Sequence, residues 1–496
     1  MGGIAFPTLS DAIRVPFAYA EFDPMVLADD ASIMPYTVLL IGQMFTSGDF
    51  KGKAEPLTIQ RPMSAGEAAN LFGQGSMLAT MCAAYFKANT ITKMLCIGVA
   101  DAAEGTAAQG ALTLNGTVTS AAPLCLYLGG TRVRASAPSG ATAAQIADSL
   151  TTAINSDKTL PVTATFSAGQ ITLTARHKGE CGNDVDLRLN YADETMPGGI
   201  TATFTAMSGG TGNPDPAPII AAMQDEQYHV IGIGMTDIVT LAALKSELDD
   251  RWGPMRQIDG QALMVKRGTF GVCTTFSGAR NDKHLTVIPS EGSPTNPWED
   301  CAACVGIVAY YGNNDPARPF NTLVVPGVLA PAKADRWANY PDKNQGLFEG
   351  LSTRFVNASG QVCLQKLITT YRINAAGADD DAFLSLNSPL TLSYLRHDWN
   401  NYLKLKYPRH KLAGDADASR FDSTQPIMTP SLGKSEAIAR CADVWVPQGL
   451  VEGLDAFKRS ILCARNDKNP NRLDWMFEPD LVNQFEIAGT LIRHIV

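Results

Sequence analysis

The sequence lacks long runs of like charge. Its 496 residues include 49 acidic and 40 basic side chains, which gives a formal net charge of -9. A protein that binds nucleic acid usually presents a basic patch or stripe to the phosphates. We therefore expect no direct contact with nucleic acid, and we interpret the charge as that of an acidic, solvated surface.

The sequence also lacks a secretory signal and a membrane-spanning run. The first cation is Arg14, so the amino-terminal stretch has no basic n-region. The longest strongly apolar stretch, Cys301 to Tyr311, is too short to cross a bilayer, which needs roughly 20 residues. We expect synthesis and assembly in the cytoplasm, no membrane insertion, and a buried helix at this stretch.

Cysteines and histidines form no complete metal or redox motif. The ten cysteines lie mostly inside apolar segments, where thiols behave as small core residues. Cys301 and Cys304 have the spacing of a redox or metal pair, but no second pair and no histidine lies nearby. The six histidines are far apart in sequence, which leaves only spatial clustering open. We predict core packing for the cysteines and no cofactor.

Three other patterns fail as catalytic or ligand-binding motifs. The segment from Gly48 to Lys53 is one residue too short for a phosphate loop and is followed by Ala54. Gly350-Leu-Ser352-Thr-Arg354 has arginine where a nucleophile elbow needs glycine. The acidic trio Asp379 to Asp381 lacks the central glycine of a calcium loop, although a weak ion site there stays open. We predict no catalytic residues and no strong metal site.

What the sequence does contain, over residues 26–100 and again over 213–335, is the pattern of an α/β domain. Short apolar runs predict buried strands, and amphipathic runs between them predict helices. A capping box at Ser64 to Glu67 predicts a helix start, and Asp237 is expected to cap a second helix. The predicted strands are Tyr36 to Ile41, Leu57 to Gln60, Met94 to Val99, His229 to Gly234 and Ala262 to Val265. We expect them to share one sheet.

Between residues 101 and 212 the composition shifts to Thr, Ala and Gly. Short alternating segments predict a β-rich domain with one helix near Thr142 to Ile154. We also predict that Cys125 to Val133 is a single strand. The stretch closes on a turn-rich segment, Ser208 to Asp215, of the kind that accepts insertions. The sequence therefore predicts an inserted domain that splits the α/β domain.

Both ends of the chain alternate between apolar and other residues with a period of two, which is typical of strands. Residues 1–25 form one such arm and residues 484–496 the other, and neither has a hairpin partner in sequence. Such strands need a sheet to join. The apolar positions that would face that sheet are Val15, Phe17 and Tyr19 in the first arm and Phe485, Ile487 and Leu491 in the second.

Residues 336–483 are predicted to form a carboxyl-terminal domain. It includes a long polar helix predicted from Leu392 to Lys406, and the most basic neighbourhood of the chain surrounds the end of that helix. The cations are Arg396, Lys404, Lys406, Arg409 and Lys411. Two interpretations stay open, a solvated helix face and an electrostatic docking surface for an acidic protein.

Several phrases of the carboxyl-terminal third give the sequence a specific resemblance. In chain order they are Lys366-Leu-Ile-Thr-Thr-Tyr371, Tyr394-Leu-Arg396, Tyr407-Pro-Arg-His-Lys-Leu412, Gly449-Leu-Val-Glu452, Asp455-Ala-Phe-Lys458, Asn469-Pro-Asn-Arg-Leu-Asp474 and Asp480-Leu-Val-Asn-Gln-Phe485. With these phrases the chain resembles the tail sheath proteins of contractile-tailed phages, particularly those of the phage Mu type. The likeness continues more loosely through Tyr228-His229, Arg251-Trp-Gly-Pro254 and Arg14 to Asp23.

The resemblance implies an α+β, multidomain tail-sheath fold: mixed sheets flanked by helices, an inserted β-rich outer domain, and extended terminal strands donated to the carboxyl-terminal domain of a neighbour. It implies a structural subunit of the virion tail, made in the cytoplasm of a bacterial host. The implied partners are further copies in a helical homopolymer, a tail tube protein, and baseplate and tail terminator proteins. The basic neighbourhood would then be the tube-docking candidate.

Two alternatives remain at this point. One is the sheath subunit of a tailocin or of another contractile injection system, which would share the same fold. The other, less favoured, is an α/β hydrolase, because the region from Tyr36 to Val265 has the texture of one. The hydrolase would need a convergent nucleophile and base, and the sequence offers no ordered motif for either. We therefore expect that the chain is not an enzyme.

Overall fold

The computed structural model describes residues 34–167, 169–422 and 424–494. Two compact units are present. One contains residues 35–394 together with the segment from 481 onward, and the other contains residues 395–480. The boundary at Tyr394 falls inside one helix, whereas the predicted carboxyl-terminal domain begins at residue 336.

The larger unit is built on a six-stranded sheet in the order β13-β12-β11-β1-β3-β2. The first five strands of that order are parallel, and β2 is antiparallel. The strands are β1 (Thr37–Gln43), β2 (Ile59–Gln60), β3 (Lys93–Val99), β11 (Val230–Ile233), β12 (Gln261–Lys266) and β13 (Leu285–Pro289). Since β1 pairs with β3 before the insertion and with β11 after it, the predicted shared sheet is confirmed.

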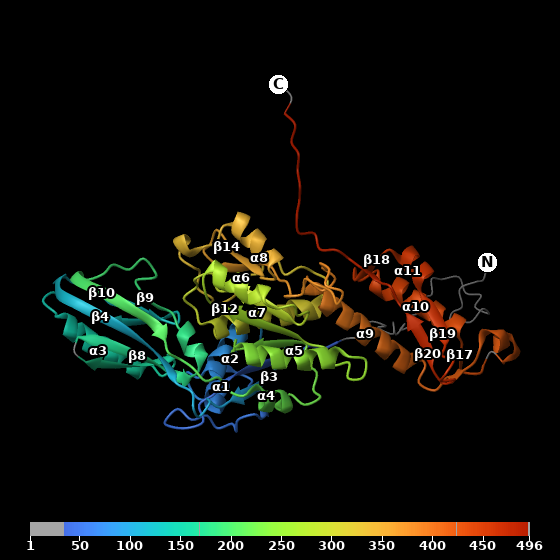
Figure 1. Ribbon diagram of the computed structural model, residues 1–496, viewed down its shortest axis with the longest axis horizontal. Coiled ribbons are helices and arrows are strands. Elements are labelled where there is room, and N and C mark those ends of the chain that lie inside the picture. Colours follow the sequence, from blue (N-terminus) through green and yellow to red (C-terminus); the bar gives the residue numbers. More distant parts are fainter. Residues whose placement is uncertain (1–33, 168, 423, 495–496) are drawn as a thin grey trace, which may run out of the picture. The chain divides into compact units, whose positions relative to one another are not determined.

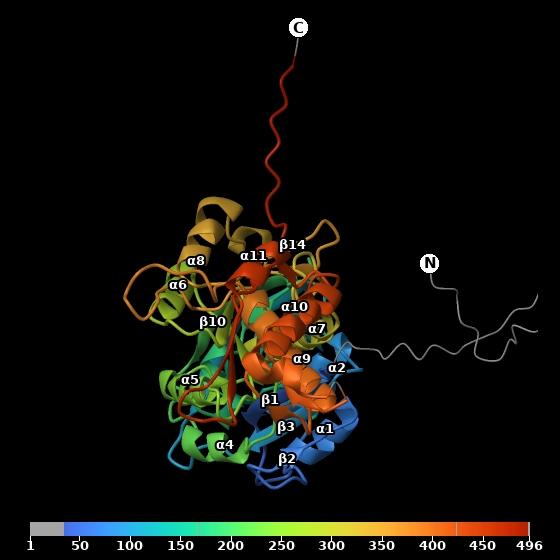
Figure 2. The same ribbon diagram turned by 90° about the vertical axis from the view of Figure 1, so that its right-hand side faces the viewer.

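Helices cover both faces of this sheet, as the unbroken burial of its central strands requires. The helices are α1 (Ala65–Phe72), α2 (Met77–Ala88), α4 (Pro216–Ala222), α5 (Ile238–Trp252), α6 (Phe270–Gly278) and α7 (Pro297–Asn314). Leu39 and Ile41 of β1 pack into one apolar cluster with residues of α4, α5 and α6. On the other face α7 lies so close to β11 that a β-carbon on Gly232 would meet Val305 at 3.0 Å. Figure 2 shows β1 beside β3.

The inserted segment forms two antiparallel sheets. A four-stranded sheet runs β10-β4-β8-β7, and a three-stranded sheet runs β6-β5-β9. The strands are β4 (Ala107–Ser120), β5 (Leu124–Leu128), β6 (Thr131–Ala135), β7 (Val162–Ser167), β8 (Gln170–Lys178), β9 (Leu187–Leu189) and β10 (Gly198–Ser208). Helix α3 (Ala143–Ser156) begins with a full capping box at Thr142 and contributes its buried face to the core. Figure 1 shows β4, β8 and β10 side by side.

The single strand predicted from Cys125 to Val133 is wrong. The structure has a hairpin there, in which β5 and β6 pair with each other across Gly129 and Gly130. Both glycines have positive φ, +57° and +85°, a conformation that glycine adopts at little steric cost. An alternating apolar pattern therefore runs through a turn that the glycine pair dictates.

Towards its carboxyl end the larger unit adds α8 (Asn344–Phe348) and an antiparallel pair, β14 (Thr353–Val356) with β15 (Val362–Lys366). The smaller unit holds the remaining elements. They are β16 (Lys411–Leu412), β17 (Ile427–Met428), α10 (Pro430–Arg440), β18 (Val451–Glu452), α11 (Leu454–Ser460), β19 (Leu462–Arg465) and β20 (Leu473–Met476). Helix α9 (Asn387–Lys406) crosses the boundary between the units, and β21 (Asp480–Leu481) lies at the other boundary.

The core of the smaller unit is aromatic and contains one buried ion pair. Trp399 contacts Trp445, Trp475 and Phe477 with ring centroids 5.0–6.4 Å apart. Asp398, which is fully buried, accepts hydrogen bonds from the Arg440 guanidinium at 2.8 Å and the Trp445 indole at 2.7 Å. This pairing satisfies the buried carboxylate and ties α9 to α10.

Candidate functional site

The carboxyl-terminal segment forms no strand in the structure, although its alternation predicts one. Residues 482–494 make no ladder, and Phe485, Ile487 and Leu491 are 83%, 86% and 79% exposed. A strand needs a neighbouring backbone to receive its amides and carbonyls, and none of the described residues supplies one here. The three predicted positions are thus presented to solvent together. Their donation to a neighbour stays a prediction.

The root of this segment is fixed to the larger unit. The Gln484 side chain donates to the Ala317 carbonyl at 3.3 Å, and the Ser385 hydroxyl donates to its amide oxygen at 3.4 Å. The Glu486 carboxylate pairs with the Lys366 ammonium at 2.5 Å. The segment therefore leaves the body of the protein after residue 486. The candidates of the other arm, Val15, Phe17 and Tyr19, lie outside the described residues.

The hairpin of β19 and β20 is a two-stranded sheet, with Leu462 opposite Met476 and Cys463 opposite Trp475. One face packs on α10, where the Trp475 indole donates to the Gly433 carbonyl at 3.1 Å. On the other face Leu462 and Met476 are 56% and 46% exposed. A lone two-stranded sheet is marginal in water, and strands at its edges can accept another chain. Sequence reasoning did not predict this acceptor geometry.

The five predicted docking cations lie on three successive stretches: Arg396 in the middle of α9, Lys404 and Lys406 at its end, Arg409 in the loop after it, and Lys411 in β16. Lys404 and Arg409 are exposed, and Arg396 is half-buried. Lys406 pairs with Glu436 at 2.7 Å and donates to the Tyr402 hydroxyl at 2.7 Å, while Lys411 donates to the Gln425 amide oxygen at 2.8 Å. The cluster is thus partly used within the unit. Its exposed cations are the ones suited to meet an acidic partner.

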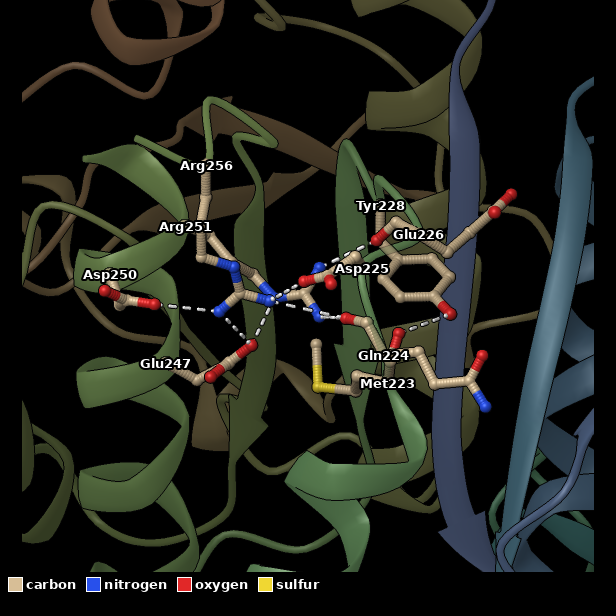
Figure 3. Close-up of polar contacts among 9 residues, drawn as sticks. All are labelled: Met223, Gln224, Asp225, Glu226, Tyr228, Glu247, Asp250, Arg251 and Arg256. Atoms are coloured by element: carbon tan, nitrogen blue, oxygen red, sulfur yellow. Dashed lines mark hydrogen bonds and ion pairs between the residues drawn. The ribbon is translucent and has the colours of Figure 1, made fainter. Parts of the chain in front are cut away.

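The ion pairs and hydrogen bonds of Arg251 and Arg256 support the fold (Figure 3). Arg251 is 1% exposed and donates to the Glu226 carbonyl at 2.7 Å, to the Gln224 carbonyl, and to Glu247 at 2.6 Å. Arg256 binds Glu247 and Asp250, both at 2.9 Å, and Asp225 at 2.7 Å. The hydrogen bond with Asp250, reinforced by Asp225 and Glu247, raises the pKa of Arg256.

These contacts hold the turn before β11 against the end of α5, at the amino-terminal edge of the parallel strands. The Tyr228 hydroxyl adds a hydrogen bond to the Met223 carbonyl at 3.1 Å. Charge-assisted bonds to backbone carbonyls satisfy groups that the turn would otherwise leave unpaired. Arg251, the first residue of the Arg251-Trp-Gly-Pro254 phrase, therefore has a structural role in supporting the edge of the sheet.

The residues of two rejected sequence motifs, the cysteine pair and the nucleophile-elbow segment, make contacts in the core of the protein. Cys301 donates to the Leu263 carbonyl at 3.2 Å, and burial raises the pKa of its thiol to about 12. Ser352 is fully buried, and its hydroxyl donates to the Ile368 carbonyl at 3.1 Å. Arg354 pairs with the buried Asp300 at 2.6 Å. A thiol with so high a pKa, or a hydroxyl without access, is a poor nucleophile.

A hollow of about 710 Å³ lies where the inserted segment returns to the larger unit, beside the start of α5. Its lining includes Glu180, Asp215, Asp237 and Lys266, and no serine, cysteine or histidine. Among the described residues, no group of His, Cys, Asp or Glu is arranged to hold a metal ion. In the part of the chain that the structure describes, no helix is long and apolar enough to span a membrane.

The comparisons with known proteins identify the family. A model of the phage tail sheath protein central domain matches residues 209–370, and a model of the phage tail sheath C-terminal domain matches residues 378–491. The Mu-like prophage FluMu tail sheath protein of Haemophilus influenzae is 36% identical over 495 residues, covering 99% of this chain and 100% of the relative. The chain therefore belongs to the phage tail sheath family.

Membership makes the chain a structural component of a phage tail. The resemblance to sheath proteins of the Mu type is thereby confirmed, and so is the α+β, multidomain fold with several sheets. Two solved structures of sheath tail proteins are also similar. That from Desulfitobacterium hafniense has a TM-score of 0.47 and 11% identity, covering 94% of this chain and 100% of its own. The structure from Listeria innocua has a TM-score of 0.45 and 10% identity, covering 92% of this chain and 97% of its own.

Proposed function

We propose that this chain polymerises into a helical sheath around a tail tube, and that contraction of the sheath drives the tube through the host envelope. Assembly takes place in the cytoplasm of the bacterial host, and baseplate and tail terminator proteins bound the polymer at its two ends. The observation that supports this proposal best is the exposed terminal segment with Phe485, Ile487 and Leu491, which has no strand partner among the described residues.

The hairpin of β19 and β20 is the acceptor that we favour for such a segment. No further strand among the described residues pairs with its outer edges, and Leu462 and Met476 offer exposed apolar surface next to them. A donated strand with about five backbone hydrogen bonds, each worth roughly 1 kcal/mol net, would contribute on the order of 5 kcal/mol. Burial of the apolar side chains would add to this. Strand exchange of this kind would keep neighbours linked.

Contraction requires two packings of the same subunits with different free energies. Linked subunits can rotate about their terminal segments, which is hinge motion, while the exchanged strands persist. The assembly moves only towards the packing with better total contacts, so the extended sheath would be held by a kinetic barrier. We infer that contacts between outward-facing domains improve on contraction, while weaker, partly ionic contacts with the tube are released.

Electron microscopy of the purified protein at increasing concentration tests polymerisation. Helical tubes are the expected result. Deletion of residues 1–23 should loosen or abolish these tubes without lowering the melting temperature of the subunit. A protein that stays monomeric at every concentration, or a fully intact polymer after that deletion, would contradict strand exchange by the amino-terminal arm.

The carboxyl-terminal arm allows a test with a matched control. Aspartate at Ile487 and Leu491 places charges on the side of the strand that is expected to be buried, and should prevent polymers. Aspartate at Ala488 and Thr490, on the other side of the same segment, should be tolerated. All four residues are exposed in the isolated chain, so neither variant should unfold the subunit. Equal effects of the two variants would argue against a donated strand with one buried side.

The tube-docking role rests on the exposed cations. Lys406 is a poor probe because its reversal to glutamate would repel Glu436 within the unit. Reversal of Lys404 and Arg409 to glutamate should impair assembly around tubes while leaving tube-free sheath polymers intact. Lys51→Glu with Lys53→Glu, a double reversal of exposed cations outside this cluster, serves as the control for added negative charge. Normal tube-filled tails with the double variant would overturn this assignment.

A further inference from the structure

The four-stranded sheet of the inserted domain ends in two edges with the same sequence. Its order places β10 at one edge and β7 at the other. β7 contains Thr163-Ala-Thr-Phe166, and β10 contains Thr201-Ala-Thr-Phe204. The strands of this sheet are antiparallel at every pair, so β7 and β10 run in opposite directions. Two copies set side by side in the same orientation would thus bring these edges together as an antiparallel pair.

The side chains of both edges would continue the faces of the sheet across such a joint. Thr163 and Thr165 of β7 and Thr201 and Thr203 of β10 are exposed, and the ladder contacts place them on one face with Thr172 of β8. Within β7 and within β10 these exposed threonines alternate with residues of the core face. Any antiparallel register that puts threonine opposite threonine therefore keeps the exposed face on one side and the core face on the other.

Neither edge has the features that usually prevent strands from joining. Natural edge strands are commonly protected by charged residues or proline, yet β7 and β10 contain neither. No like charges would meet in the joint. On the core face Phe166 and Phe204 are half-buried, so each edge leaves part of a phenyl ring for a neighbour to cover.

One side chain occupies the β7 edge in the single chain. Asn155 of α3 donates to the Ala164 carbonyl at 2.8 Å and accepts from the Ala164 amide at 2.9 Å. A carboxamide offers the same donor and acceptor as a peptide group, so Asn155 stands where one residue of a further strand would stand. The β10 edge has no such cover among the described residues.

We propose that inserted domains of neighbouring copies join edge to edge in the sheath, with β10 of one copy pairing with β7 of the next and displacing Asn155. This contact would use different surfaces on the two partners, so it propagates along a polymer and does not stop at a dimer. It rests on the proposed polymerisation and adds a link separate from the terminal arms. The partner is a second copy of this chain.

Cysteine cross-linking tests the joint. A chain with Thr165→Cys and Thr203→Cys should give a ladder of covalent oligomers when assembled sheaths are treated with diamide, which takes up the two electrons and two protons released by each thiol pair. Thr163→Cys with Thr203→Cys tests the neighbouring threonine register. The control is Thr172→Cys with Thr203→Cys, since Thr172 lies on the same face but on an inner strand and should give only monomer.

Two further sets of variants test the joint: charged residues at its threonine positions, and removal of the Asn155 side chain that covers the β7 edge. Thr165→Lys with Thr203→Lys puts like charges in the joint and should remove contacts between inserted domains, whereas Thr165→Glu with Thr203→Lys should restore them. Asn155→Ala uncovers the β7 edge and should move ladder formation by the cysteine pair to lower protein concentration. The melting temperature of each free subunit checks that the variants fold.

Sheaths that form normally but give no ladder above the control, in either register and in both extended and contracted forms, would overturn the joint and leave the proposed function standing. A cysteine-pair chain that also carries Asn155→Ala and still gives no ladder would overturn it as well. Failure of the unmodified chain to form tubes at all would instead strike the proposed function.

Discussion

Strand β1 and the segment 482–494 are both apolar-rich and both were expected to be strands, yet they have opposite fates. Every residue of β1 is buried, with β3 on one side and β11 on the other. The terminal segment leaves Ile487 and Leu491 almost fully exposed. What separates them is the presence of a partner backbone in the same chain, because a strand is stable only as part of a sheet.

The two regions differ in the source of their stability. The larger unit around the six-stranded sheet is held together by internal contacts, including a buried ion pair between Arg354 of β14 and Asp300 of α7. The terminal segment is anchored at its root, through contacts such as those of Gln484 and Glu486. Substitutions in the first region should therefore change the free energy of unfolding, and substitutions in the second should change assembly.

The largest loss of stability is expected when the buried ion pair loses one partner. Arg354→Met leaves the Asp300 carboxylate, which is fully buried, without its cation, and should lower the free energy of unfolding by about 3–5 kcal/mol. Urea titration of the free subunit measures this. The double variant Arg354→Met, Asp300→Leu removes the uncompensated charge and should recover most of the loss. A single variant as stable as the unmodified chain would break the comparison.

A smaller effect should appear as a change in the pH dependence of unfolding. Burial raises the pKa of Asp282 to about 6, so the folded state holds its proton where the unfolded state does not, and stability falls as pH rises from about 4 to 6. Burial lowers the pKa of His284 to about 4, so stability instead falls as pH drops below about 6.5. The two dependences oppose each other.

Asp282→Asn keeps an oxygen for the His284 amide, which lies 2.8 Å away, but removes the first dependence. The stability of this variant should rise with pH between about 4 and 6.5, and near pH 7 it should exceed that of the unmodified chain. Thermal unfolding at a series of pH values gives the comparison. Identical pH profiles would count against the raised pKa of Asp282.

Next in size is the cap of α5. The Asp237 carboxylate accepts a hydrogen bond from the Thr240 amide at 2.9 Å, as predicted from the sequence. Asp237→Ala should lower the free energy of unfolding by about 1 kcal/mol. Asp237→Ser, which keeps an acceptor, should lose less, and a loss as large as that of alanine would argue against the cap.

The smallest effect on stability is expected at the root of the terminal segment. The ion pair of Lys366 and Glu486 is partly exposed, so Lys366→Ala should cost only about 0–1 kcal/mol. If the root positions the donated strand, the same substitution should still lower the yield of sheath polymers. Unchanged polymer yield would show that this ion pair does not position the donated strand.

The sequence predicted the central sheet well because buried parallel strands are short and continuously apolar, as in β1 and β3. It did not predict β13 of that sheet, and it missed β10, whose threonine, glycine and alanine residues lack an apolar run. It also merged β5 and β6, since the alternation continues across the glycine turn. The alternation of apolar residues indicates which side chains share a face, but it does not show where the chain reverses direction.

The sequence predicted which residues belong to the candidate sites, but not which contacts those residues make. The alternation marked Phe485, Ile487 and Leu491, which are exposed, and charge marked the end of α9. That Lys406 is engaged by Glu436, and that Asn155 covers one edge of the inserted sheet, depends on contacts between residues 30 and 9 positions apart. Such contacts follow from tertiary packing, which the local pattern does not encode.

The ion pair between Lys366 and Glu486 also limits how far the donated segment can reach from the larger unit. Residues 487–494 can span at most about 28 Å when fully extended, since each residue adds roughly 3.5 Å. In the proposed polymer, an acceptor hairpin beyond that radius of Lys366 could not hold these residues without breaking the root contacts. The attachment of one glutamate thus acts as a tether of fixed length, which bounds how far adjacent subunits can travel apart during contraction.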